Sequence, residues 1–197
     1  MSLKKKTDVN YHSVNDNPTP VSIDGQVIIP PQPANVWDDA FKLSNAWAVT
    51  VTNCDINPHG GNREDGIDIN RFCRDVLIKN CRVRSGDKYA VTIKGGSHQI
   101  TLQDVTIHGP RGKEGVDIDI GNFCDWNYAM TNDITLKNVS REDGEPVRLR
   151  IGRGENVNIV GGNVKVLVIQ SFLLKAYVWA KFWLQHWLNP KINGFRR

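Results

Sequence analysis

Two carboxyl groups stand two residues apart in a stretch with β-strand character, where a single isoleucine separates Asp117 from Asp119. On a strand, residues i and i+2 point to the same face, with backbones roughly 6.6 Å apart. Inverting glycoside hydrolases use two carboxyl groups about 6.5–9.5 Å apart. The spacing therefore permits acid–base cleavage of a glycosidic bond, and Asp117 and Asp119 are candidate catalytic residues.

A repeat in the chain predicts the scaffold that would position these acids. Copies begin at residues 21, 49, 76, 100 and 134, and a looser sixth begins at 157, so the steps are 28, 27, 24, 34 and 23 residues. In each copy, apolar residues alternate, meet one Asn, Asp or Gly, and then alternate again out of phase. Such a period is typical of a β-solenoid, in which each repeat forms one coil.

The residue between the two alternating segments predicts a corner. Asn53, Asn80, Asp104 and Asn138 occupy this position, and Asn, Asp and Gly tolerate the left-handed backbone that a sharp bend requires. We expect these four side chains to stack as a ladder, each bonded to its neighbour one coil away. A series of β-hairpins is the alternative, but most of the turns lack the Asn-Gly or Asp-Gly pairs that hairpins favour.

A third short strand lies between successive copies. Its members are Phe41–Leu43, Ile67–Ile69, Val91–Ile93, Ile118–Ile120 and Leu149–Ile151. The sequence therefore predicts an all-β chain with three strands per coil and roughly six coils. It divides into an N-terminal arm (1–20), a β-helix (21–170) and a C-terminal helix and tail (171–197).

The Asn-ladder corner, the coil length and the strand Asp65-Gly-Ile-Asp-Ile69 resemble the pectate-lyase-like right-handed parallel β-helices over about residues 21–165. That superfamily includes polysaccharide lyases, glycoside hydrolases and bacteriophage tailspikes. The resemblance implies that the third strands and the loops before them face a sugar. It also implies that a lyase of this type would hold Ca²⁺ with acids and use an arginine as base, roles that Asp68, Asp117, Asp119 and Arg150 fit by residue type; otherwise no cofactor or metal is expected.

Stacking the third strands predicts two outward rows. The first row is Lys42, Asp68, Thr92, Asp119 and Arg150, and the second is Ala40, Gly66, Ala90, Asp117 and Arg148. The small residues predict a shallow trough in which Lys42, Asp68, Thr92 and Arg148 would bind substrate, with Glu64, Asp65 and Glu114 as reserve acids. The structural alternative is that Asp117–Arg148 and Asp119–Arg150 are ion pairs that neutralise neighbouring coils.

Composition limits the partners. A net charge of +4, from 25 basic and 21 acidic residues, is too balanced to indicate a nucleic-acid surface. The four cysteines have no CxxC spacing and indicate reduced core thiols. The first residues lack the apolar stretch of a secretory signal, so we expect synthesis in a host cytoplasm.

The C-terminal segment predicts a helix from Ser171 to Leu188 with docking residues Phe172, Trp179, Trp183 and Trp187. It could cap the open end of the solenoid, contact another subunit or, less favourably, lie on a membrane surface. With few coils, short loops and no secretion signal, a catalytic groove is disfavoured. We therefore expect a homo-oligomeric component of a bacteriophage virion, a capsid decoration or tail spike that contacts other virion proteins and polysaccharide; a small polysaccharide lyase or glycoside hydrolase is the alternative.

Overall fold

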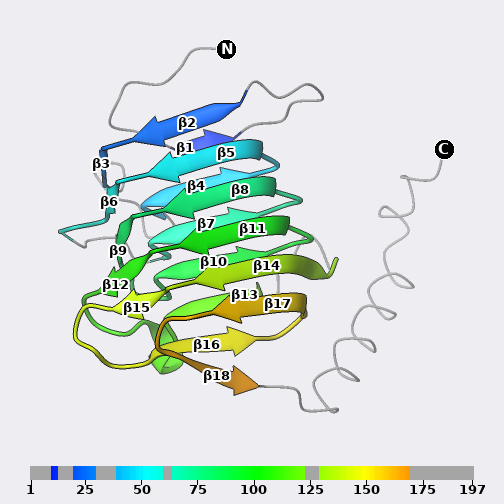
Figure 1. Cartoon of the computed structure of the whole chain (residues 1–197). Helices are drawn as coiled ribbons and strands as arrows, with labels where there is room; N and C mark the ends of the chain where they lie inside the picture. The colour runs from blue at the N-terminus through cyan, green and yellow to red at the C-terminus, as the bar shows by residue number, and fades with distance from the viewer. Residues whose placement is uncertain (1–9, 13–19, 30–38, 60–63, 123–128, 169–197) are drawn as a thin grey trace. The chain divides into compact units, whose positions relative to one another are not determined.

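Three parallel sheets form the solenoid in the computed structural model, which describes residues 10–12, 20–29, 39–59, 64–122 and 129–168 (Figure 1). Sheet A contains, in order, β1 (Asn10–His12), β4 (Phe41–Ser44), β7 (Ile67–Asn70), β10 (Val91–Lys94), β13 (Ile118–Asn122), β16 (Val147–Ile151) and β18 (Val164–Val168). Sheet B contains β2 (Val21–Asp24), β5 (Trp47–Thr52), β8 (Arg74–Lys79), β11 (His98–Gln103), β14 (Thr131–Lys137) and β17 (Gly154–Val160). Sheet C contains β3 (Val27–Ile28), β6 (Asp55–Ile56), β9 (Arg82–Arg84), β12 (Thr106–His108) and β15 (Ser140–Arg141).

The strand register confirms the predicted stacking. One inward column of sheet A runs through Phe41, Ile67, Val91, Ile118 and Leu149, each fully buried. Cys54, Cys81, Val105 and Val139 are buried at equivalent positions beyond the corner between sheets B and C. Because successive coils contribute apolar side chains at these two columns, the core is continuous along the solenoid.

The corner ladder forms as predicted, with one break. Asn53, Asn80, Asp104 and Asn138 have φ of 54, 52, 53 and 52°. The Asn80 amide donates to Asn53 over 3.4 Å, and the Asn138 amide donates to Asp104 over 2.9 Å. Asp104 has no amide hydrogen to offer Asn80, because a carboxylate only accepts. The ladder gains an unpredicted member in Asp24, which accepts from Asn53 over 2.8 Å.

A second row of left-handed residues was not predicted. Ala48, Asp75, Gln99, Asp133 and Asn156 have φ of 50–55° and lie at or near the starts of the sheet B strands. The register skips Ala48, because Trp47 pairs with Arg74 and Val49 with Val76. Asp75 is skipped at the same point as Ala48, so the paired strands stay in register and bend together at this row.

The predicted N-terminal arm contains a described strand, whereas the residues after 168 lie outside the described part of the chain. Within the predicted N-terminal arm, β1 pairs in parallel with β4, with Asn10 opposite Lys42. The chain divides into two compact units, Met1–Leu167 and Val168–Arg197. The predicted docking residues Phe172, Trp179, Trp183 and Trp187 lie outside the described residues, as does the predicted C-terminal helix. In the described part of the chain, no helix is long and apolar enough to cross a membrane.

Candidate functional site

The first predicted row lies in register on sheet A, but most of it is buried. Lys42 pairs with Asp68, Asp68 with Thr92, Thr92 with Asp119, and Asp119 with Arg150 along the ladder. Asp68, Thr92 and Asp119 are 2%, 1% and 1% exposed, whereas the side chains of Lys42 and Arg150 are 29% and 13% exposed. The expectation of a solvent-exposed row is therefore wrong in its middle and holds only at its two ends.

The second row does not form the predicted trough. Ala40, Ala90 and Asp117 are 1%, 0% and 0% exposed. A Cβ added to Gly66 would lie 2.5 Å from the carbonyl oxygen of Arg84 and 2.7 Å from that of Ala90. Neighbouring backbone packs against Gly66, and Ala40 and Ala90 are buried, so the small residues of this row do not mark a groove for a ligand.

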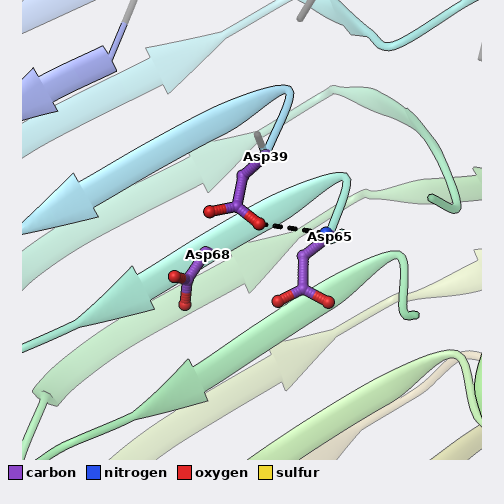
Figure 2. A group of neighbouring side chains, drawn as sticks. All are labelled: Asp39, Asp65 and Asp68. Atoms are coloured by element: carbon purple, nitrogen blue, oxygen red, sulfur yellow. Dashed lines mark hydrogen bonds between the residues drawn. The ribbon is translucent and has the colours of Figure 1, made fainter. Parts of the chain in front are cut away.

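Three carboxyl groups and two ammonium groups meet on sheet A. The carboxyl groups of Asp39, Asp65 and Asp68 converge, with one oxygen of each within 4.8 Å of the others (Figure 2). Asp39 also accepts from the backbone N–H of Asp65 over 3.0 Å. Lys42 contacts Asp39 at 2.7 Å and Asp68 at 3.1 Å, and Lys94 contacts the other oxygen of Asp68 at 3.1 Å. Asp39 and Lys94 were missed as site residues.

Burial and mutual repulsion shift the titration of this cluster. Burial, together with the charges of Asp68 and Asp39, raises the pKa of Asp65 well above its usual range. Burial and the charge of Asp68 also raise the pKa of Asp39. Burial opposes the charge on Lys42, but the nearby carboxylates outweigh it and raise the pKa of Lys42. With a proton on Asp65, two carboxylates balance two ammonium groups, and the buried cluster is neutral.

The donors of this cluster do not fit the Ca²⁺ that a lyase would use. Ca²⁺ takes six to eight oxygen ligands. Here both oxygens of Asp68 already contact ammonium groups, and Lys42 also engages Asp39. A divalent cation among these acids would face two ammonium groups at close range, so the lysines supply the positive charge in place of a metal.

The predicted pair between Asp119 and Arg150 is confirmed. Arg150 donates to the two oxygens of Asp119 over 2.9 and 2.7 Å and also binds Tyr89 and Glu114. The guanidinium carbon lies 5.1 Å from the centre of the Tyr89 ring, which is a cation–π distance. The bond to Asp119 outweighs burial and raises the pKa of Arg150, so this side chain is poorly suited to act as a base.

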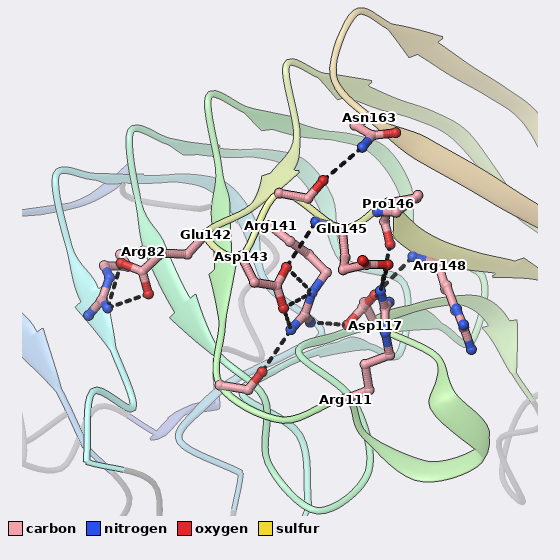
Figure 3. A network of polar contacts seen from close by, with 12 residues as sticks. Arg82, Arg111, Asp117, Arg141, Glu142, Asp143, Glu145, Pro146, Arg148 and Asn163 are labelled. Atoms are coloured by element: carbon pink, nitrogen blue, oxygen red, sulfur yellow. Dashed lines mark hydrogen bonds and ion pairs between the residues drawn. The ribbon is translucent and has the colours of Figure 1, made fainter.

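We expected Asp117 to pair with the side chain of Arg148, but it does not. It binds two other arginines, Arg111 on one oxygen and Arg141 on the other at 2.6 Å, and it accepts from the backbone N–H of Arg148 at 2.8 Å (Figure 3). Arg141 also donates to Asp143 and to the carbonyl oxygen of Gly109. Asp117 is 0% exposed and Arg141 is 6% exposed, so this is a buried ion cluster.

The ion pairs of Asp117 and Asp119 suit a structural role better than proton transfer to a substrate. A general acid or base must reach its substrate, but Asp117 is fully buried among three donors and Asp119 is held by Arg150. Arg141 was missed, although the aligned repeat contains the signal. It follows Ile28, Ile56, Val83 and Ile107 in an inward column of sheet C, where a charged residue requires a buried partner.

Comparison with known proteins supports the fold. Residues 13–160 match a family model described as a right handed beta helix region. No curated protein and no solved structure matches this chain. Because the matched span covers most of the chain, the protein belongs to the right-handed β-helix family.

Proposed function

We propose that this chain is a structural β-helix module of a surface assembly, and that the outer face of sheet A holds polysaccharide without cleaving it. The observation that carries the proposal is a set of cationic side chains on this face, fixed in place by buried carboxylates. Lys42 and Lys94 are anchored by Asp68, and Arg150 is anchored by Asp119.

These cations remain partly accessible. The side chains of Lys42, Lys94 and Arg150 are 29%, 20% and 13% exposed, and Arg148 is exposed nearby. Donors whose positions are already fixed lose little conformational entropy when they bind, which favours recognition of sugar hydroxyl or carboxylate groups. The candidate catalytic acids are also occupied, Asp119 by Arg150 and Asp117 by Arg111 and Arg141, which favours binding over turnover.

We further propose that the assembly is a bacteriophage virion, in which the chain serves as a capsid decoration or tail spike and forms homo-oligomers. The support is the resemblance to tailspike β-helices and a scaffold whose coils are tied by backbone ladders, the Asn ladder and ion pairs. A virion component must withstand load outside the cell, and such cross-coil bonding suits that role.

A binding assay with the purified full-length chain tests the sugar-holding face. We expect saturable binding to at least one member of a panel of neutral and anionic polysaccharides, with no new reducing ends and no unsaturated products. Arg148→Gln removes one exposed cation on this face and should weaken binding about tenfold. Lys137→Gln is the matched control, because it removes an exposed cation from sheet B.

Two outcomes would overturn parts of the proposal. Product formation by the wild-type chain that is abolished by Asp119→Asn would make the face catalytic. Equal loss of binding in Arg148→Gln and Lys137→Gln would show that net charge, not sheet A, attracts the polysaccharide. The virion assignment is tested separately, by whether the native protein sediments with capsid or tail proteins or remains free.

A further inference from the structure

Two cysteines lie one above the other in the core. Cys54 follows the corner residue Asn53, and Cys81 follows Asn80 at the equivalent position of the next coil. Backbone bonds hold the two coils in register on both sides, from Asn53 N–H to the carbonyl of Lys79 at 3.1 Å and from Arg82 N–H to the carbonyl of Cys54 at 2.9 Å. Adjacent strands lie about 4.8 Å apart, which is inside the range of roughly 4.4–6.8 Å between the Cα atoms of a disulfide.

The two thiols occupy equivalent positions in adjacent coils and influence each other's titration. The thiol of Cys54 donates to the carbonyl oxygen of Thr52 over 3.1 Å, and the thiol of Cys81 donates to that of Lys79 over 3.2 Å. The neighbouring thiol of Cys81 is the largest cause that lowers the pKa of Cys54 to about 7, and Cys54 in turn raises the pKa of Cys81. Of the two thiols, Cys54 is therefore the one whose thiolate is favoured.

The segment that covers Cys54 lies at the edge of two sheets. Both thiols are 2% exposed, but the segment over Cys54 belongs to β2 and β3, which are the edge strands of sheets B and C (Figure 1). Residues 24–27 of this segment are exposed, and a Cβ added to Gly25 would meet nothing within 4 Å. Edge segments with few covering contacts open locally more readily than the core.

The third described cysteine has none of these features. Cys73 lies in the turn between β7 and β8, in a column with Ala46 and Ser97, so it has no thiol above or below it. Its sulfur donates to the carbonyl of Asn70 over 2.9 Å and accepts from the backbone of Ala46 over 3.4 Å. Burial raises the pKa of Cys73 to about 11. Cys73 is therefore a built-in control, and Cys124 lies outside the described residues.

We infer that Cys54 and Cys81 form a redox-active thiol pair that reacts with small disulfides to give a disulfide between the second and third coils. The Cys54 thiolate attacks one sulfur of a disulfide such as glutathione disulfide, and one glutathione thiolate leaves. Cys81 loses its proton and attacks the Cys54 sulfur of the mixed disulfide, which releases the second glutathione. Two protein thiols are oxidised, and one glutathione disulfide is reduced to two thiols.

The test exposes the folded full-length chain to glutathione disulfide at pH 7, quenches with acid, alkylates and maps the cysteine peptides by mass. We expect a Cys54–Cys81 cross-link, with Cys73 still alkylated as a free thiol. In Cys81→Ser, the reaction should stop at a glutathione adduct on Cys54. Cys73→Ala should behave as the wild type does.

Rates provide a readout that needs no variant. With a pKa of about 7 for Cys54 and about 11 for Cys73, we expect about half of Cys54 but only roughly one in 10⁴ of Cys73 to be thiolate at pH 7, while the lower pKa reduces nucleophilicity by nearly two orders of magnitude. In a competition with a trace of iodoacetamide, Cys54 should therefore be alkylated about 10²-fold faster than Cys73. Equal rates, or a folded chain that gives no cross-link although the denatured chain reacts at every cysteine, would overturn the inference.

Discussion

Replacement of Asp117 by asparagine should strongly destabilise the fold, because it breaks a buried ion cluster without changing its shape. Asp117 is 0% exposed, and its two oxygens accept from Arg111, Arg141 and the backbone of Arg148. In Asp117→Asn, the new NH₂ group must point at one of these donors, and Arg141 loses its buried carboxylate partner and keeps only the half-exposed Asp143. Removing one member of a buried pair costs about 3–5 kcal/mol, which lowers the melting temperature by about 6–20 °C in a chain of this size.

Urea unfolding at pH 7, followed by circular dichroism, measures this change. Asp143→Asn is the matched control, because Asp143 binds the same arginine at 2.7 Å but is 50% exposed. This variant should lose far less free energy of unfolding than Asp117→Asn. The double variant Asp117→Asn/Arg141→Met should recover part of the loss, because methionine suits the apolar column above it. If the free energy of unfolding of Asp117→Asn lies within about 1 kcal/mol of the wild-type value, the buried ion cluster does not stabilise the fold.

Four further measurements follow from the structure. Because the pKa of Asp65 is raised, this carboxyl group keeps its proton to higher pH in the folded chain than in the unfolded chain, so its contribution to stability should fall as pH rises above 3.8; Asp65→Asn should remove this contribution in urea titrations between pH 4 and 8. Asn138→Ala should cost about 1–2 kcal/mol in urea unfolding through backbone strain and the lost bond to Asp104, and Asn138→Gly should cost less because glycine accepts this φ. Ala48→Asn should stabilise by about 1 kcal/mol, because asparagine tolerates the left-handed backbone at φ 55°, and a calorimetric melting temperature at or below that of the wild type would contradict this. If the Cys54–Cys81 disulfide forms, closing this loop should add about 3.5 kcal/mol, measured as urea unfolding before and after reduction.

Much of the fold could be predicted because stacking converts sequence alignment into contacts. Once the repeats are aligned, equivalent positions become neighbours in adjacent coils, so Phe41 above Ile67 and Asp119 beside Arg150 follow directly. The second left-handed row was missed because Ala48, Asp75, Gln99, Asp133 and Asn156 share a backbone conformation but no residue type. Ala48 and Gln99 are poor formers of that conformation, so packing of the coils imposes it on them.

The site was predicted less well because burial depends on what packs over a strand. The repeat places Asp68, Thr92 and Asp119 on the outer face, but it carries no information on how much of that face is covered. Asp39 escaped notice because it precedes β4, outside the repeated segments, and it joins Asp65 and Asp68 only through the fold. Non-repeating residues that meet in space are invisible to an argument based on periodicity.

Arg141, a member of the ion cluster, lies on an edge strand, and exposed edge strands are a general hazard in β-solenoids. Among the described residues, β15 is the edge strand of sheet C, with β12 on one side and no further strand of that sheet on the other. An edge strand that presents apolar side chains and open backbone groups invites pairing with another chain, and an inward-pointing charge discourages it. Arg141 places such a charge in the core column at this edge, and Asp117 and Asp143 satisfy it. Asp117 thus has a structural reason for its position that requires no substrate, and this is the strongest physical argument against a catalytic role for it.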